Sequence, residues 1–226
     1  MIILKTVVIN AGPKRKDSNA QLMKYAAKGA ESVGADVEYV DLYKLDLRGC
    51  MSCMICKQEG KSCKCHWRDE TSPLIERILD SDCLLIGVPI FFTDPCSHYK
   101  ALMERLVFCI VDYKVGNAFK GKINVGLFYS IFHSVSYFEN KLRPNLKMSE
   151  DLFKMFKGKV EINSIRHIVQ RDYDMASDEE TIKLREEQFE LDLKIQAWLI
   201  IFYMVTVRCY WIVSYFFFFI NRALIS

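Results

Sequence analysis

The chain has 226 residues, of which 51% are hydrophobic and 26% charged, so it can bury a sizeable core and wholesale disorder is excluded. Its 31 Lys and Arg residues barely outnumber its 28 Asp and Glu residues, and a net charge of +3 is too mild to indicate a nucleic-acid-binding surface. Nine cysteines stand out, five of them within residues 50–65.

The N-terminal segment predicts a strand and not a signal peptide. Residues 2–10 form an apolar, β-branched run with no basic lead and no small-residue cleavage site. We therefore expect a cytoplasmic protein, and in that reducing compartment a tight cysteine cluster serves a metal or redox site more often than a disulfide framework.

Residues 1–196 alternate short apolar runs with amphipathic segments. After the first strand, Ala11-Gly12-Pro13 signals a turn, and Ser18 or Asn19 can cap a helix that continues to about residue 33. Further strands are expected at 36–41, 83–88 (stopped by Pro89), 123–129 and 160–168, and further helices from 72, at 97–109, at 137–156 with a break near Arg143-Pro144, and at 178–196. Five strands separated by helices predict one α/β domain, with a parallel sheet covered on both faces.

The segment 48–67 has little periodicity and is expected to be a long functional loop. Cys50, Cys53, Cys56 and Cys63 bring four thiols together, which suits a [4Fe–4S] cluster. A zinc site is the second interpretation, because Cys65-His66 supplies two further ligands. Free thiols on a loop that lines a substrate site are the third.

In an open parallel sheet, ligands bind beyond the carboxyl ends of the strands. The loop after the first strand leads into a helix N-terminus, which can hold a phosphate through unpaired N–H groups; the side chains of Ser18 and Asn19 and the charge of residues 14–16 would add to it. The third strand ends in a segment with Phe91 and Phe92, against which a planar heteroaromatic ring could lie. The alternatives are an ordinary capped helix and two aromatic side chains packed under a helix.

Six short motifs occur in the order in which a known family has them. They are Asn10-Ala11-Gly12-Pro13-Lys14, Gly49-Cys50-x-x-Cys53-x-x-Cys56, Gly87-Val88-Pro89-Ile90-Phe91-Phe92, Glu104-Arg105-Leu106-Val107-Phe108, Tyr129-Ser130 and Arg185-Glu186-Glu187-Gln188-Phe189. By these motifs, residues 1 to about 190 resemble the flavodoxin-like NAD(P)H-dependent FMN reductases, and within them the branch that contains the iron–sulfur flavoproteins.

The resemblance implies a flavodoxin-like three-layer αβα fold with a five-stranded parallel sheet in the order 2-1-3-4-5, usually a homodimer with one FMN. It places the cofactor against two groups of residues, which are Gly12, Pro13, Lys14, Ser18, Asn19 and Ala20 around the phosphate, and Pro89, Ile90, Phe91 and Phe92 along the isoalloxazine ring. Three departures weaken the phosphate site. Gly12 replaces the family's serine, and Ser18-Asn19 replaces its usual Asn-Thr pair. Lys14 replaces an arginine and so lacks the bidentate fork that arginine offers to phosphate.

The expected function is that of an FMN-dependent oxidoreductase that takes electrons from NAD(P)H and passes them to free flavin, a quinone or another small acceptor. No catalytic side chain is assigned, because the flavin performs the chemistry; His98 either touches the ring or is a solvated or capping residue. One alternative is an iron–sulfur electron carrier with a [4Fe–4S] cluster on Cys50, Cys53, Cys56 and Cys63, reduced by a ferredoxin. Another is a non-catalytic, membrane-tethered flavodoxin-like module.

The last 30 residues, 197–226, differ from the domain that we place at residues 1–196. Residues 197–220 are apolar except for Arg208, and their length suits a membrane-spanning helix. A central arginine costs about 2.5–3.5 kcal/mol on insertion. The tail is therefore interpreted as a membrane anchor, as a buried or interface helix, or as an aberrant terminus.

Overall fold

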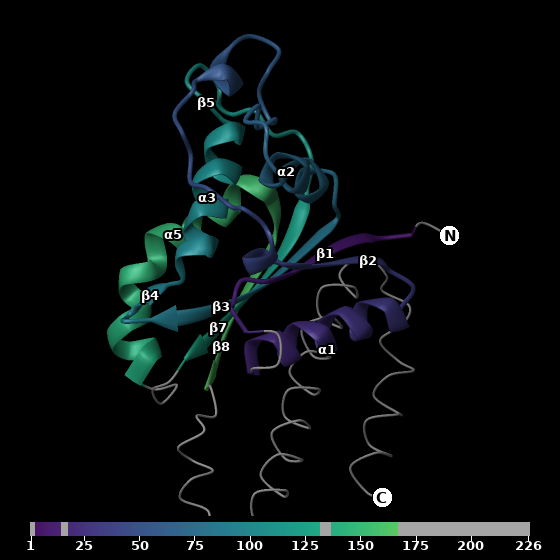
Figure 1. The fold of residues 1–226 in the computed structure, drawn as a ribbon, viewed down its shortest axis with the longest axis vertical. Helices are drawn as coiled ribbons and strands as arrows, with labels where there is room; N and C mark the ends of the chain where they lie inside the picture. The colour runs from purple at the N-terminus through teal and green to yellow at the C-terminus, as the bar shows by residue number, and fades with distance from the viewer. Residues whose placement is uncertain (1–2, 15–17, 132–136, 167–226) are drawn as a thin grey trace, which may run out of the picture.

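The structure is a computed structural model that describes residues 3–14, 18–131 and 137–166. Its main sheet has parallel strands in the order β2-β1-β3-β7-β8, with a short β4 paired antiparallel to the end of β3 (Figure 1). This confirms the predicted flavodoxin-like order. The strands are β1 (Lys5–Asn10), β2 (Asp36–Asp41), β3 (Cys83–Phe91), β4 (Asp94–Pro95), β7 (Ile123–Ile131) and β8 (Lys157–Arg166), and a separate hairpin pairs β5 (Val111–Asp112) with β6 (Gly116–Asn117).

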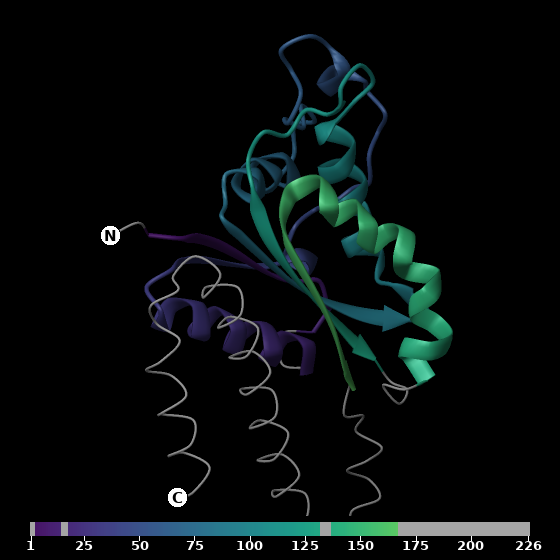
Figure 2. The same cartoon turned by 180° about the vertical axis from the view of Figure 1, so that it is seen from behind.

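Helices cover both faces of the sheet, as Figures 1 and 2 show from opposite sides. One face carries α1 (Ser18–Ser32). The other carries α2 (Thr71–Leu79), α3 (Ser97–Ile110) and a run of short turns between residues 138 and 156. The shorter helical segments of the structure are η1 (Leu42–Lys44), η2 (Ile55–Lys57), η3 (Phe138–Leu142), η4 (Arg143–Leu146), α5 (Lys147–Asp151) and η5 (Leu152–Phe156), of which the last four form the run at 138–156.

The period-two alternation of the strands divides the core into two clusters. Along β1, Val7 and Ile9 belong to the cluster under α2 and α3, whereas Val8 faces α1 together with Leu22 and Met23. Strand β3 repeats the pattern, with Leu85 on the α1 side. Both faces of the central strands are buried, which is why these strands are uniformly apolar in the sequence.

The prediction that Pro89 stops the third strand is wrong. Strand β3 continues to Phe91, because the parallel ladder with β7 ends at the pair Pro89–Ser130 and the next residues pair with β4 instead. Proline, which has no N–H to donate, is tolerated at this point where one ladder ends. The other predicted boundaries that fall on described residues agree within about three residues, and the segment 138–156 is helical but irregular.

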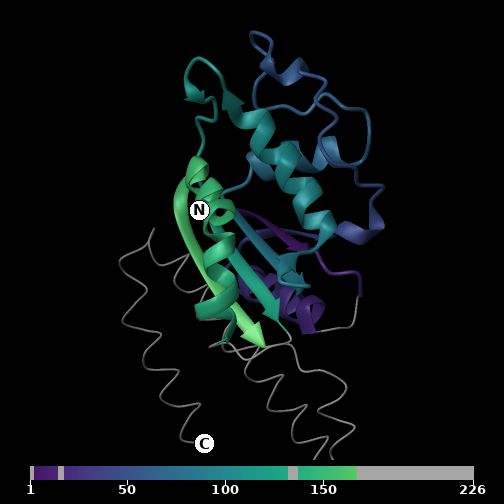
Figure 3. The ribbon, with the colours of Figure 1, turned by 90° about the vertical axis from the view of Figure 1, so that its left-hand side faces the viewer.

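Helix α3 connects two ends of the molecule. It begins just after β4, near the carboxyl ends of the strands, and ends at β5, beside the cysteine segment (Figures 1 and 3). The predicted helix at 178–196 and the tail at 197–226 lie outside the described residues, so the domain boundary remains a prediction. None of the helices in the described ranges has the length and apolarity needed to cross a bilayer.

Candidate functional site

Asn10, the last residue of β1, organises the first loop at the strand ends. Its buried Oδ1 accepts the Gly12 main-chain N–H (3.0 Å) and the Asn19 side-chain amide (2.6 Å), and its own amide donates to Asp41 Oδ1 (3.0 Å). Burial works against ionisation of Asp41, but hydrogen bonds from Lys44 and Asn10 hold the pKa of this carboxyl below its usual value. The loop after β1 is thus fastened to β2 and to α1.

Asn19, in the first turn of α1, is completely buried. Its side-chain amide donates to Asn10 Oδ1 and to the carbonyl of Gly87 (3.2 Å), while its Oδ1 has no hydrogen-bond partner. Both amide hydrogens are used inside the protein, so the predicted side-chain donation from Asn19 to a phosphate is replaced by an anchoring role. Its main-chain N–H belongs to the first turn of α1, where N–H groups lack an acceptor within the helix.

The predicted phosphate loop and the predicted ring loop lie side by side. The Ala11 N–H donates to the Gly87 carbonyl (2.9 Å), and a Cβ on Gly12 would stand 3.5 Å from the Pro89 ring. The Cys96 thiol also donates to the Ala11 carbonyl (3.0 Å). Burial raises the pKa of Cys96 to about 11, so it acts as a neutral donor that joins the two loops.

The hairpin between β3 and β4 exposes two aromatic side chains. Ile90 is buried, but Phe91 is 36% exposed and Phe92 is 100% exposed. Phe92 and Thr93 both have positive φ values, 48° and 77°, in the left-handed region that costs a non-glycine residue roughly 1–3 kcal/mol. The strained tip therefore holds an aromatic ring in solvent at the carboxyl edge of the sheet.

His98 lies against a residue that the sequence did not single out. Its ring stacks on Tyr43, with centroids 3.6 Å apart and planes 16° from parallel. Burial lowers the pKa of His98, so the ring is neutral near pH 7. Tyr43 belongs to η1, directly after β2, and its position beyond a strand end was the only available signal.

The edge formed by these loops is where we predict a mononucleotide. The start of α1 offers main-chain N–H groups for a phosphate, and Lys14 is exposed beside them. Phe91 and Phe92 offer an apolar surface for a planar ring on the same edge. Pro13 is also exposed, whereas Gly12, Ala20 and Pro89 are buried and contribute main chain.

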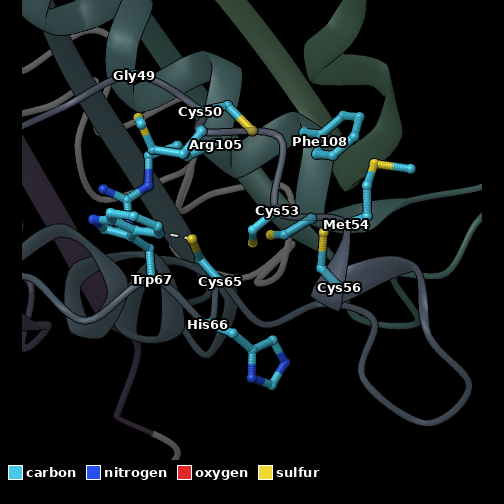
Figure 4. Close-up of a pocket in the computed structure, with 12 residues that line it drawn as sticks. Gly49, Cys50, Cys53, Met54, Cys56, Cys65, His66, Trp67, Arg105 and Phe108 are labelled. Atoms are coloured by element: carbon cyan, nitrogen blue, oxygen red, sulfur yellow. Dashed lines mark hydrogen bonds between the residues drawn. The ribbon is translucent and has the colours of Figure 1, made fainter.

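A second cluster surrounds a small pocket beside α3 (Figure 4). Cys50, Cys53, Cys56 and Cys65 all line this pocket, which we call the cysteine pocket. Its other lining residues are Gly49, Met51, Met54, His66, Trp67, Arg105, Phe108 and Cys109. The structure thus brings together three of the four predicted cluster ligands and adds Cys65.

The fourth predicted ligand, Cys63, is not among the described residues that line the cysteine pocket. Its main-chain N–H donates to the carbonyl of Cys109 (2.8 Å), and its φ is +60°. Burial raises the pKa of the Cys63 thiol, whereas the nearby charges of Lys120, Lys157 and Lys57 lower it.

Arg105 is the charged residue of the cysteine pocket. Its side chain is only 2% exposed; it pairs with Asp69 (2.5 Å) and donates to Cys65 Sγ (3.2 Å) and to Ser72 Oγ (2.8 Å). Burial raises the pKa of Asp69, but Arg105 and main-chain N–H groups lower it by more. The pKa of this carboxyl therefore lies below its usual value. The sequence signal for this role was the motif Glu104-Arg105-Leu106-Val107-Phe108, which gave no indication of the partner of Arg105.

Four thiols line the cysteine pocket, which is the number of cysteine ligands that a [4Fe–4S] cluster takes. Within the described part of the chain, no three His, Cys, Asp or Glu side chains are close enough to hold one metal ion, which does not favour the zinc interpretation. A [4Fe–4S] cluster binds each thiolate to a different iron and so spaces its ligands more widely. The cavity is about 20 Å³, room for one water, so the exposed loop with Met51 and Cys53 would move outward around a cluster.

Known proteins with similar sequences are iron–sulfur flavoproteins. One from Methanocaldococcus jannaschii is 24% identical over 123 residues, which are 54% of this chain and 62% of the relative. Another, from Archaeoglobus fulgidus, is 23% identical over 104 residues, 46% of each protein. The chain therefore matches roughly half of the length of these relatives.

Solved structures with the same fold include an NAD(P)H:quinone oxidoreductase from Methanothermobacter marburgensis, with a TM-score of 0.62, 17% identity and coverage of 85% of this chain and 96% of the other. An azoreductase from Bacillus anthracis has a TM-score of 0.62 and 14% identity, covering 88% and 99%. These likenesses confirm the predicted fold. The family model described as NADPH-dependent FMN reductase matches residues 4–161, and this chain belongs to that family.

Proposed function

We propose that this chain is an FMN-dependent oxidoreductase that takes electrons from NAD(P)H and passes them to a small acceptor such as free flavin or a quinone. The proposal is carried by one observation, the edge of the sheet at which the loop of Gly12 contacts the loop of Pro89 beside the start of α1. Membership of the NADPH-dependent FMN reductase family supports the choice of flavin and of nicotinamide.

In this proposal, main-chain groups hold the FMN phosphate. The N–H groups in the first turn of α1, with the helix dipole behind them, face the phosphate. The buried side chains of Asn10 and Asn19 keep the loop in place, and exposed Lys14 adds a positive charge. The proposed phosphate residues are Gly12, Pro13, Lys14, Ser18, Asn19 and Ala20.

The isoalloxazine ring is proposed to lie along Pro89, Ile90, Phe91 and Phe92. Ile90 is buried, so it would contribute main chain, while Phe91 and Phe92 would contribute apolar surface. Bound FMN would supply the hydride and electron transfer, which needs no acid or base from the protein. The part left to the side chains is to orient the ring, and no catalytic residue is proposed.

The direct test is the absorbance spectrum of the purified full-length chain, before and after incubation with FMN, followed by an assay of NADH and NADPH oxidation with a quinone. We expect flavin absorbance bands and acceptor-dependent oxidation. A protein that stays colourless in excess FMN would contradict the proposal and favour a flavodoxin-like module without flavin.

Phe92→Ala tests the ring site with little risk to folding. Because Phe92 is fully exposed, its truncation should change the free energy of unfolding by less than about 0.5 kcal/mol. We expect weaker FMN binding or a higher KM for the acceptor. The matched control is Val115→Ala, an exposed apolar truncation in the β5–β6 hairpin at the other end of α3, which should change neither quantity. Equal effects of Phe92→Ala and Val115→Ala would argue against the β3–β4 hairpin as part of the flavin site.

A second candidate function is an electron carrier with a [4Fe–4S] cluster as well as FMN, reduced by a ferredoxin. The cysteine pocket favours it, because four thiols and a buried arginine surround one space. Helix α3 joins the two sites: His98 in its first turn lies near the flavin loops, and Arg105 and Phe108 line the cysteine pocket roughly 10–15 Å further along the axis. When present, a cluster would supply one-electron transfer.

Iron and acid-labile sulfide, assayed after anaerobic purification, separate the two candidates. The carrier predicts about four of each per chain and faster reduction by ferredoxin than by NAD(P)H. If neither iron nor sulfide is retained after anaerobic reconstitution, the carrier fails while the flavin oxidoreductase stands.

For assembly we propose a homodimer with no stable protein partner in the NAD(P)H-driven version. Its support is a groove of about 420 Å³ along α3, lined by apolar residues such as Met103, Val107 and Leu152 together with the charged residues Asp94, Lys100 and Glu104. Light scattering of the purified chain tests the dimer.

We also propose a cytoplasmic location. Fractionation of cells that express the full chain tests this location against membrane attachment through residues 197–220.

A further inference from the structure

We propose that Cys65, and not Cys63, completes the ligand set of an iron–sulfur cluster bound by Cys50, Cys53 and Cys56. The inference rests on the carrier version of the proposed function and concerns which thiol of the cysteine pocket binds iron. The sequence favours Cys63, because it follows Cys56 most closely. The structure places Cys65 at the pocket and Cys63 outside its lining.

The loop that carries the first three cysteines is fastened to α3 at both ends. At its start, the Cys50 N–H donates to Glu104 Oε2 (3.2 Å), and a Cβ on Gly49 would approach that oxygen to 2.6 Å. At its end, the Lys57 ammonium donates to the carbonyls of Phe108 and, at 2.5 Å, of Val111. The loop therefore holds its thiols against the same stretch of α3 that carries Arg105.

The backbone between the three cysteines is unusual. Ser52, directly before Cys53, has a φ of 50°, and Met54, directly after it, has a φ of 58°. Each left-handed non-glycine residue costs roughly 1–3 kcal/mol, and such strain gathers at binding sites where the surroundings enforce it. The two turns let successive cysteines of one short loop face one pocket (Figure 4).

Arg105 distinguishes Cys65 from the other thiols chemically. Its guanidinium is always charged, is almost completely buried, and donates to Cys65 Sγ at 3.2 Å. A charged donor favours the thiolate, which is the form that binds metal, and hydrogen bonds to sulfur set the potential of a cluster. Asp69 balances the single positive charge of Arg105, so Arg105 acts on Cys65 through a directed N–H donor and not through a net charge on the pair.

Cys63 is held in a different role. Both Cys63 and Cys65 pack against the main hydrophobic core, but Cys63 donates its main-chain N–H to the Cys109 carbonyl in the last turn of α3 and does not line the cysteine pocket. Two residues later the chain reaches Cys65, on the Arg105 side of the cysteine pocket (Figure 4). Spacing in the sequence is therefore a poorer guide to the ligand than position around α3.

The test compares Cys65→Ser and Cys63→Ser with the wild-type full-length chain, all purified anaerobically and reconstituted with ferrous iron and sulfide. Readouts are iron and sulfide per chain, the absorbance of the cluster, and the electron paramagnetic resonance spectrum after reduction with dithionite. FMN content and the thermal melting temperature show whether each variant is folded.

We expect Cys63→Ser to keep the iron content and spectrum of the wild type, and Cys65→Ser to lose most of its iron or to give the spectrum of an incomplete cluster. Iron loss in Cys63→Ser at intact folding, whether or not Cys65→Ser also loses iron, overturns the assignment. A wild-type chain that takes up no iron removes the carrier function itself, and the inference with it.

Discussion

Asn19 is a polar residue without access to solvent, and its contacts explain how the first loop keeps its shape. One side chain joins the end of β1, through Asn10, to the middle of β3, through the Gly87 carbonyl. A buried amide is stable only when its donors are satisfied, and here they are. The unpaired Asn19 Oδ1 is the one cost within this arrangement of described residues.

Asn19→Ala should therefore lower both stability and affinity for FMN. Loss of the two hydrogen bonds is expected to reduce the free energy of unfolding by roughly 1–3 kcal/mol. The loosened loop should also raise the Kd for FMN. Denaturant unfolding and flavin fluorescence titration measure the two effects, with Glu31→Gln at the exposed end of α1 as the control. An unchanged Kd would show that the Asn19 side chain plays no part in positioning the phosphate loop.

Asp69 provides a second residue-scale prediction, on pH. The pKa of Asp69 is below its ordinary value of 3.8 in the folded state, because Arg105 and main-chain donors outweigh its burial. The stabilising effect of the ionised Asp69 is thus complete above pH 3.8 and is lost as the pH falls through the pKa that Asp69 has in the folded state. Asp69→Asn should cost roughly 1–3 kcal/mol at neutral pH and should flatten the acid limb of the stability curve.

Denaturant unfolding between about pH 3 and pH 7 checks this. Asp46→Asn, which removes an exposed carboxylate 3.6 Å from Arg48, is the control and should barely change the curve. Parallel curves for the wild type and Asp69→Asn would contradict the role given to the buried pair.

At the scale of elements, the approach of α1 to β3 depends on a missing side chain. A Cβ on Gly87 would stand 2.7 Å from Met23 Cγ and 2.8 Å from Asn19 Oδ1, both closer than real contacts allow. Only glycine lets α1 pack this closely on the strand, so this residue sets the position of the helix N-terminus relative to the sheet. That position decides where a phosphate could bind.

Gly87→Ala should push α1 away from the sheet. Overpacking of this kind costs about 1–3 kcal/mol, and we also expect weaker binding of FMN. Thermal melting and flavin titration give the two numbers. In a Met23→Ala background the cost of Gly87→Ala should be smaller, because the nearest atoms have been removed. A cost that is equal in both backgrounds would show that the clash with Met23 is not the cause.

At the scale of the whole molecule, the two proposed sites lie at opposite ends of α3 and use different chemistry. The flavin edge uses main-chain groups that any parallel sheet of this order presents at its switch point. The cysteine pocket uses thiols of one loop and an arginine of α3. Ligands at the flavin edge should accordingly stabilise the entire fold.

FMN at a hundredfold excess over its Kd should raise the free energy of unfolding by about 2.7 kcal/mol. Riboflavin, which has the same ring without the phosphate, should raise the melting temperature less at equal concentration, because it leaves the start of α1 unpaired. Thermal shift measurements with both ligands check this. Equal shifts for the two ligands would mean that α1 does not hold the phosphate.

The sequence by itself determined the alternation of strands and helices, the resemblance to the reductase family and the two loops at the strand ends. These features are local: a period of two or 3.6 residues, a turn, or a short motif appears in a few neighbouring residues. The end of β3 was missed because its continuation past Pro89 depends on β4, a partner formed only in the folded chain.

Only the tertiary structure decided the details of the sites. It turned Asn19 inward, stacked His98 on Tyr43, and brought Cys65 and Arg105 to one pocket whose lining does not include Cys63. Each of these outcomes depends on contacts between residues that are far apart in the chain. Their free energies are decided by burial and by charge partners, which spacing along a sequence does not encode.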